Sequence, residues 1–213
     1  FVCYNCGMIK LLSFDLDKTI LDVNSWEVVH SYLGFTKEED EALMNLYQSG
    51  GINNQEWLEL ISKTWKTRNP GCTPESILAN VSLPVKSGFE EALRILRSKY
   101  PDLKIGIISG APSFVVAHFK DVFGLDFAIA DNLIDFESGS VSMYKDKSGD
   151  DKFLILKDVS LEYGLDLGEC MHVGDGMNDV GIFEATGNGV TFNWCGDKVK
   201  EKAKYVISEF SEL

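Results

Sequence analysis

Ile9-Lys10-Leu11-Leu12-Ser13-Phe14-Asp15-Leu16-Asp17-Lys18-Thr19 is the stretch that decides the fold of this chain. Its first six residues form a short, mostly apolar run with the length and composition of a buried strand. Polar side chains follow at once, among them Asp15, Asp17 and Thr19. Ligands of an open parallel sheet bind beyond the carboxyl ends of its strands. The stretch therefore predicts a central strand that carries a ligand site at its end.

Strands and helices are expected to alternate after Pro84. A Ser87-x-x-Glu90 pattern predicts the start of a helix that ends before Pro101. Further strands are expected at 104–108, 127–136, 141–144, 170–173 and 189–192, the second and third of these as a hairpin, with helices at 113–123, 151–163 and 178–185. Such alternation implies a parallel sheet covered on both faces. We predict an α/β protein with a Rossmann-like, doubly wound parallel sheet.

A helical block interrupts this alternation directly after the first strand. Thr36-x-x-Glu39 reads as a capping box, and Thr73-Pro74 reads as another helix start. Between them Trp57, Leu58, Ile61 and Trp65 recur at the spacing of one apolar helix face. We expect residues 21–84 to form a small inserted helical cap. Residues 8–20 and 85–213 would then form the core, and residues 1–7 an N-terminal extension.

Composition limits the possible partners of the chain. Its 213 residues carry 33 acidic and 20 basic side chains, a net charge of −13, which disfavours nucleic acid and anionic membranes as partners. The start of the chain lacks a secretory signal, and the five cysteines are odd in number and scattered, so a cytoplasmic protein with reduced thiols is expected. Cys3-x-x-Cys6 lacks the second close pair that a structural zinc site needs. The sequence leaves the oligomeric state open.

Three of the expected strand ends carry unusual polar groups. Asp15, Asp17 and Thr19 follow the first strand; the other two groups are Ser109-Gly110 and Asp175 with Asn178 and Asp179. If these ends converge on one crevice, four carboxylates meet there and would repel one another strongly. A divalent cation resolves this repulsion, and oxygen ligands favour Mg²⁺ over zinc. Lys152 opens a helix whose start could reach the same crevice.

Two other ligand-binding motifs are excluded because residues that they require are missing. A calcium loop that begins at Asp15 would need Gly and Glu where Ile20 and Trp26 stand. A dinucleotide loop at Gly174 would need a third Gly where Asp179 stands. The histidines have no metal or triad spacing and are expected to be ordinary structural residues: His30, His118 and His172.

Four segments together resemble the motifs of the haloacid dehalogenase-like phosphatases. The first and last are Phe14-Asp15-Leu16-Asp17-Lys18-Thr19 and Val173-Gly174-Asp175-Gly176-Met177-Asn178-Asp179. Ile108-Ser109-Gly110 is similar to the second motif, and Lys152 to the third. The resemblance runs from about Ile9 to Val206. It is nearest to the phosphoserine phosphatase-like branch, whose cap is a helical insertion after the first strand.

This resemblance implies roles for the carboxylates. Asp15 would attack phosphorus and form an aspartyl-phosphate. Asp17 would protonate the leaving oxygen and later take a proton from water. Mg²⁺ would be held by Asp15, Asp175 and the backbone carbonyl of Asp17. Asp179 would orient the metal shell or Lys152.

The resemblance also implies a phosphate site. Ser109 and Lys152 would hold the phosphoryl oxygens, and Gly110 and Asn178 would line the pocket around them. The implied activity is that of a phosphoric monoester hydrolase: Mg²⁺-dependent hydrolysis of a small-molecule phosphomonoester. Phosphoryl transfer to an alcohol acceptor and phosphate binding without turnover are the alternatives.

A phosphoserine phosphatase proper is a further alternative that two positions disfavour. The enzymes of that branch place a Glu seven residues after the acid/base Asp and an Arg in the cap. Here Asn24 stands at the first position, and the first Arg of the chain is Arg68. Free phosphoserine is therefore not expected to be the best substrate. Four cap aromatics either pack together or form a cage for an ammonium group: Trp26, Tyr32, Trp57 and Trp65.

Overall fold

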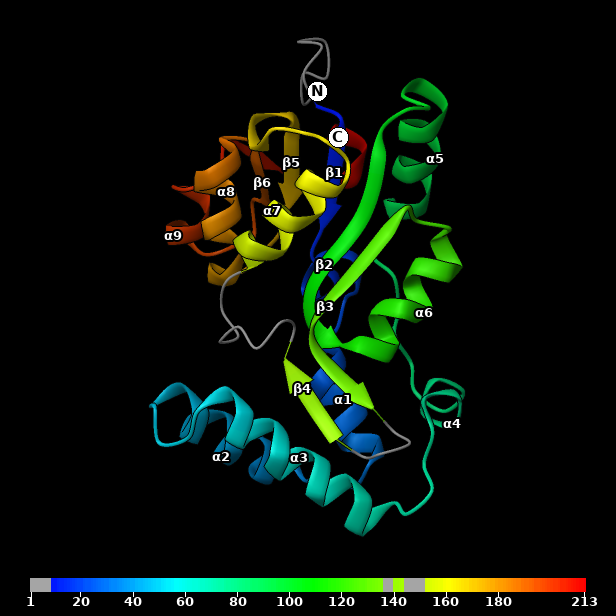
Figure 1. Ribbon diagram of the computed structural model, residues 1–213, viewed down its shortest axis with the longest axis vertical. Helices are drawn as coiled ribbons and strands as arrows, with labels where there is room; N and C mark the ends of the chain where they lie inside the picture. The colour runs from blue at the N-terminus through cyan, green and yellow to red at the C-terminus, as the bar shows by residue number, and fades with distance from the viewer. Residues whose placement is uncertain (1–8, 136–139, 144–151) are drawn as a thin grey trace.

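The computed structural model describes residues 9–135, 140–143 and 152–213, and its centre is a single seven-stranded sheet (Figure 1). The strand order is β4-β3-β2-β1-β5-β6-β7. All neighbouring strands pair in parallel except β4, which runs antiparallel to β3. The strands are β1 (Leu11–Phe14), β2 (Lys104–Pro112), β3 (Phe127–Asp135), β4 (Ser140–Met143), β5 (Cys170–Val173), β6 (Gly189–Phe192) and β7 (Tyr205–Ile207). The doubly wound parallel sheet is confirmed.

Helices cover both faces of this sheet (Figure 1). The described residues form the α-helices α1 (Ser25–Tyr32), α2 (Lys37–Gln48), α3 (Asn54–Arg68), α4 (Pro74–Leu78), α5 (Phe89–Lys99), α6 (Ser113–Phe123), α7 (Lys152–Glu162), α8 (Val180–Thr186) and α9 (Asp197–Lys200). Successive strand residues point to opposite faces. Leu12 therefore packs in one hydrophobic cluster with Phe89 of α5, and Leu11 in a second cluster with Leu156 of α7. None of the described helices is long and apolar enough to cross a bilayer.

Three sequence predictions about element boundaries were wrong. The helix expected from Ser87 begins after Gly88, whose φ of 86° makes it a left-handed N-cap without a side-chain hydrogen bond. Strand β2 continues past residue 108 because it pairs with β3 again beyond a register shift, with Pro112 opposite Asn132. The helix expected at 178–185 starts as a 3₁₀ turn and becomes α8 only at Val180. The edge strand β7 was not predicted.

The helices α1 to α4, residues 25–78, lie between β1 and α5 in the chain and beyond the carboxyl ends of β1, β2 and β3 (Figure 1). We call this segment the helical insertion. The chain enters and leaves it side by side, because Leu21 pairs antiparallel with Val85. The Asp22 N–H donates to the Pro84 carbonyl over 2.9 Å. The segments that lead into and out of the insertion are therefore bonded to each other.

The aromatic side chains of the helical insertion mainly pack against one another. Trp26, Trp57 and Trp65 are buried, and Trp26 lies with its ring 5.1 Å from that of Trp57 and 6.1 Å from that of Trp65. Tyr32 is 40% exposed and stands apart from this cluster. The three tryptophans therefore pack together, and Tyr32 does not complete a cage with them.

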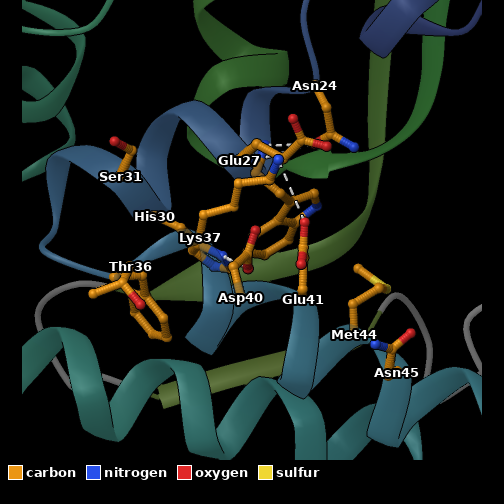
Figure 2. Close-up of a pocket in the computed structure, with 12 residues that line it drawn as sticks. Asn24, Glu27, His30, Ser31, Thr36, Lys37, Asp40, Glu41, Met44 and Asn45 are labelled. Atoms are coloured by element: carbon orange, nitrogen blue, oxygen red, sulfur yellow. Dashed lines mark hydrogen bonds and ion pairs between the residues drawn. The ribbon is translucent and has the colours of Figure 1, made fainter.

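A pocket of about 650 Å³ opens between α1 and α2 (Figure 2). It lies within the helical insertion, and none of the predicted site residues lines it. Two contacts join residues of its lining: His30 Nδ1 lies 2.5 Å from Asp40, and Lys37 Nζ lies 3.5 Å from Glu41. The predicted chemistry is located elsewhere, at the edge of the sheet.

Candidate active site

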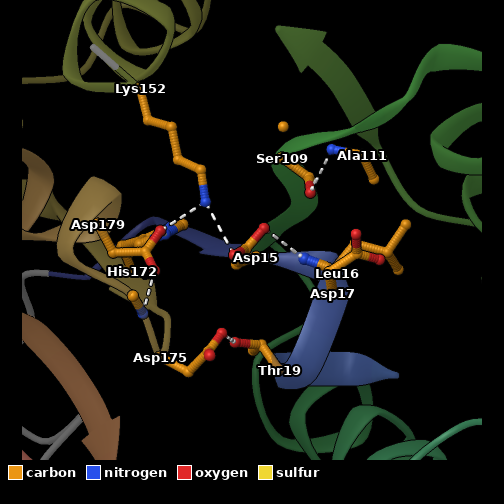
Figure 3. A network of polar contacts seen from close by, with 12 residues as sticks. Asp15, Leu16, Asp17, Thr19, Ser109, Ala111, Lys152, His172, Asp175 and Asp179 are labelled. Atoms are coloured by element: carbon orange, nitrogen blue, oxygen red, sulfur yellow. Dashed lines mark hydrogen bonds and ion pairs between the residues drawn. The ribbon is translucent and has the colours of Figure 1, made fainter. Parts of the chain in front are cut away.

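Asp15 stands directly after β1 and is 6% exposed. The backbone is still extended at Asp15, and the Leu16 N–H donates to Asp15 Oδ1 over 2.7 Å. Lys152, the first residue of α7, points its ammonium group at the other oxygen, with Nζ 2.9 Å from Asp15 Oδ2 (Figure 3). A buried carboxylate is thus held between a backbone donor and a buried cation.

Asp179 is the second partner of Lys152. Lys152 Nζ donates to Asp179 Oδ1 over 2.7 Å, and the Gly176 N–H donates to Oδ2 over 3.0 Å. His172 Nε2 lies 3.0 Å from the same Oδ1. Gly174 makes room for this arrangement, since a Cβ there would lie 2.3 Å from Asp179 Cγ. Sequence reasoning passed over His172, whose spacing to other polar residues carries no signal.

Three carboxylates form the acidic cluster of the site. Ligand oxygens of Asp15, Asp175 and Asp179 all lie within 4.8 Å of one another. Thr19 Oγ1 donates to Asp175 Oδ1 over 2.8 Å and orients that carboxylate. A donor set made only of oxygens suits Mg²⁺. Because Lys152, His172 and the Gly176 N–H engage Asp179, the lone pairs available to a metal belong mainly to Asp15 and Asp175.

Burial and neighbouring charges shift the pKa values of the site residues, often in opposite directions. Burial raises the pKa of Asp15, although Lys152 opposes the shift. Burial and the charge of Asp15 raise the pKa of Asp175 to about 6. Burial alone would lower the pKa of Lys152, but Asp15 and Asp179 outweigh it and hold that pKa above its ordinary value. The lysine is therefore charged, and the carboxylates retain an excess of negative charge that a cation would relieve.

Asp17 faces the helical insertion and not the acidic cluster. Ser25, the first residue of α1, donates its hydroxyl to Asp17 Oδ2 over 2.9 Å. Asp17 Oδ1 is buried without a hydrogen-bond partner among the described residues. Burial and the nearby charge of Asp15 raise the pKa of Asp17 to about 7. A carboxyl group with such a pKa can both give and take a proton near neutral pH. Sequence reasoning did not find Ser25.

The residues that are expected to bind phosphate do not all belong to this hydrogen-bonded network. Ser109 is 1% exposed, and its Oγ accepts from the Ala111 N–H over 3.1 Å beside Asp15 (Figure 3). The Gly110 carbonyl accepts from Trp26 Nε1 over 2.8 Å. Space is open next to the Gly110 α-carbon, where a Cβ would meet nothing within 4 Å. Asn178 is exposed and lies outside the hydrogen-bonded network that joins Lys152 and the carboxylates.

A doubly wound sheet with a buried lysine and an acidic cluster at its carboxyl edge defines an α/β protein with an oxygen-rich candidate metal site. Residues 9–187 match the family model of the haloacid dehalogenase-like hydrolases, and the chain belongs to that family.

Individual relatives agree with this assignment. A phosphoserine phosphatase of Haemophilus influenzae is 30% identical over 95% of this chain and 63% of its own length. One of Methanocaldococcus jannaschii is 26% identical over 94% of this chain and 92% of its own length. The chain spans only 52% of the length of the phosphoserine phosphatase of Archaeoglobus fulgidus. A solved phospho-aspartyl intermediate analogue of phosphoserine phosphatase has the same fold, with a TM-score of 0.70 and 23% identity over 95% of this chain and 94% of that one.

Proposed function

We propose that this protein is a phosphatase that hydrolyses a small-molecule phosphomonoester with Mg²⁺, through an aspartyl-phosphate on Asp15. One observation carries the proposal: the buried Asp15 carboxylate lies 2.9 Å from the Lys152 ammonium and within 4.8 Å of the oxygens of Asp175 and Asp179. A nucleophile, a fixed cation and a candidate metal site thus meet at one strand end. The family and the names of the relatives support the same reaction.

The reaction would proceed in two displacements at phosphorus. An Asp15 carboxylate oxygen attacks phosphorus, and the bond to the leaving oxygen breaks. Asp17, whose pKa is raised to about 7, gives its proton to that oxygen. Water then attacks the aspartyl-phosphate, Asp17 takes the proton from the water, and Asp15 is released as the carboxylate.

The remaining residues would bind and offset charge. Lys152 and Ser109 hold the phosphoryl oxygens, while Gly110 and Asn178 line the pocket around them. Mg²⁺ held by Asp15, Asp175 and the Asp17 carbonyl would supply positive charge against the phosphoryl group and the crowded carboxylates. Asp179 positions Lys152 through their 2.7 Å hydrogen bond.

We further propose that residues 21–84 act as a cap on the core formed by residues 8–20 and 85–213. The chain would flex where it enters and leaves, at the pair of Leu21 and Val85. Closure would exclude water during the first displacement. Solution scattering with and without a metal fluoride, a mimic of bound phosphate, tests this motion. Identical scattering curves would contradict a moving cap.

The activity itself is tested by phosphate release from a panel of phosphomonoesters with Mg²⁺. Asp15→Asn keeps the side-chain shape but removes the nucleophile, so we expect turnover to fall by about three orders of magnitude or more. Asp121→Asn, on the exposed surface of α6, is the matched control and should keep full activity. Near-normal turnover of Asp15→Asn would refute the mechanism. Retained phosphate binding in a wild-type protein without turnover would instead indicate a binding module.

Phosphoserine is the substrate that the relatives' names suggest, but two contacts disfavour it. Asn24 caps α1 with its side chain, accepting from the Trp26 N–H over 2.9 Å, and it carries no charge for an ammonium group. Arg68 is bound to Glu39 through two hydrogen bonds of 2.7 and 2.8 Å. We therefore propose a leaving group with less negative charge, such as an amino alcohol or a polyol. Added alcohols in the same assay would reveal phosphoryl transfer.

A further inference from the structure

A buried polar pair lies inside the sheet behind the site. Ser13 of β1 and His172 of β5 are both fully buried, and the strand register places them opposite each other. Ser13 precedes Asp15 by two residues, and His172 precedes Asp175 by three. Burying two polar side chains among apolar strands is costly unless each finds a partner. None of the steps proposed above uses either residue.

The hydrogen bonds of this pair fix the state of the imidazole ring. Asp179 as a carboxylate only accepts, so His172 Nε2, 3.0 Å from Asp179 Oδ1, must carry the proton and donate it. Ser13 Oγ lies 2.7 Å from His172 Nδ1 but 3.4 Å from the Met171 carbonyl. The shorter of these two distances favours donation from the Ser13 hydroxyl to Nδ1, so the ring proton is assigned to Nε2.

This arrangement affects Lys152 through Asp179. The Lys152 ammonium is shared between Asp15 at 2.9 Å and Asp179 at 2.7 Å. The His172 donor holds the Asp179 carboxylate in place and satisfies part of its charge. Without that donor, Asp179 would compete more strongly for Lys152, and only Lys152 and the Gly176 N–H would hold its carboxylate. The ammonium would then be drawn away from Asp15 and from the phosphoryl oxygens beside it.

We propose that His172 is a positioning residue for Lys152, acting through Asp179, and that Ser13 sets the tautomer in which it does so. The inference rests on the proposed function only where activity is the readout. Outer partners of this kind typically change activity or affinity by about 10- to 100-fold when removed.

NMR spectroscopy of the wild-type protein tests the tautomer of His172 without an activity measurement. Long-range ¹H–¹⁵N spectra should show a His172 ring with a protonated Nε2 and an unprotonated Nδ1. Ser13→Ala should weaken or shift this signature, because Nδ1 loses its donor. A ring protonated on Nδ1, or on both nitrogens, would overturn the assignment.

Substitutions test the effect on Lys152. For His172→Leu we expect kcat/KM and the affinity for inorganic phosphate to fall together, by about 10- to 100-fold. His172→Gln should recover most of both, because its amide can donate to Asp179 and accept from Ser13. His118→Leu, at an exposed histidine of α6, is the matched control and should change neither quantity.

A double variant distinguishes a positioning role of Ser13 and His172 from a purely structural one. If Ser13 acts only through His172, the double variant Ser13→Ala/His172→Leu should be no worse than His172→Leu alone. A lower melting temperature with unchanged kcat/KM and phosphate affinity would make the pair purely structural and refute the proposal. If His172→Leu does not fold, Ser13→Ala and His172→Gln still carry the test. A wild-type protein that binds phosphate without turnover would refute the proposed function alone.

Discussion

The indole Nε1 of Trp26 donates a 2.8 Å hydrogen bond to the carbonyl oxygen of Gly110, and so joins the helical insertion to the phosphate-site candidate of the core. Asn132 of β3 donates to the same oxygen over 3.0 Å. Asn54 of α3 in turn donates to Asn132 over 3.4 Å. Helix α1 therefore contacts the Gly110 carbonyl directly, α3 reaches it only through Asn132, and these contacts orient the Gly110 peptide.

Trp26→Phe removes the bond to Gly110 and keeps an aromatic ring in the cluster. A net hydrogen bond is worth about 0.5–1.5 kcal/mol, so we expect kcat/KM to fall by about 2- to 10-fold. Trp57→Phe is the matched control, because Trp57 is a buried indole of the same cluster. Steady-state kinetics and thermal unfolding of both variants decide the matter. Equal losses of kcat/KM would show that packing, and not the Gly110 contact, matters.

Gly174→Ala places a methyl group 2.3 Å from Asp179 Cγ. Asp179 cannot yield easily, because Lys152, His172 and the Gly176 N–H hold it. Overpacking of this kind costs about 1–3 kcal/mol, so both the melting temperature and the turnover should fall. Gly168→Ala is the control, since a Cβ there meets nothing within 4 Å. Unchanged turnover in Gly174→Ala would mean that the position of Asp179 is not critical.

Asp175→Asn should weaken Mg²⁺ binding. The substitution removes one negative charge from the acidic cluster while the Thr19 hydroxyl can still donate to the side-chain oxygen. We expect the dissociation constant for Mg²⁺, measured by titration calorimetry, to rise about tenfold or more. Asp102→Asn, at an exposed turn before β2, should bind Mg²⁺ as the wild type does. The same affinity in both variants would place the metal elsewhere.

Substrate preference should run against phosphoserine. Each missing charged contact costs about 1.5–3 kcal/mol, which is about tenfold or more in kcat/KM. Phosphoserine should therefore be a poorer substrate than phosphoethanolamine, phosphocholine, glycerol phosphates or sugar phosphates. Arg68→Gln should leave the ranking unchanged, because Arg68 is committed to Glu39. If phosphoserine ranks first, Glu27 and a cap lysine must replace the missing pair of contacts.

Local patterns in the sequence determined much of the fold. The capping box of Thr36 and Glu39 was predicted because its partners lie three residues apart, and the helix start at Thr73-Pro74 was predicted from two adjacent residues. Asp15 and Asp175 were expected to meet because the carboxyl ends of adjacent parallel strands share one edge, and β1 pairs with β5. The positions of the helix starts and of the strand-end carboxylates can therefore be predicted from local spacing and from the order of strands along the chain.

The tertiary structure alone decided which side chains support the site. Ser13 and His172 are 159 residues apart in the chain, and Trp26 and Gly110 are 84 apart. In the sequence, Arg68 is the first arginine that the expected cap offers to a substrate. In the structure its guanidinium is instead hydrogen-bonded to Glu39, 29 residues away in the chain. Such contacts depend on the register between strands and on how the helical insertion packs against the sheet. Hydrophobic period and local spacing do not specify either of these, because both arise from packing between distant segments.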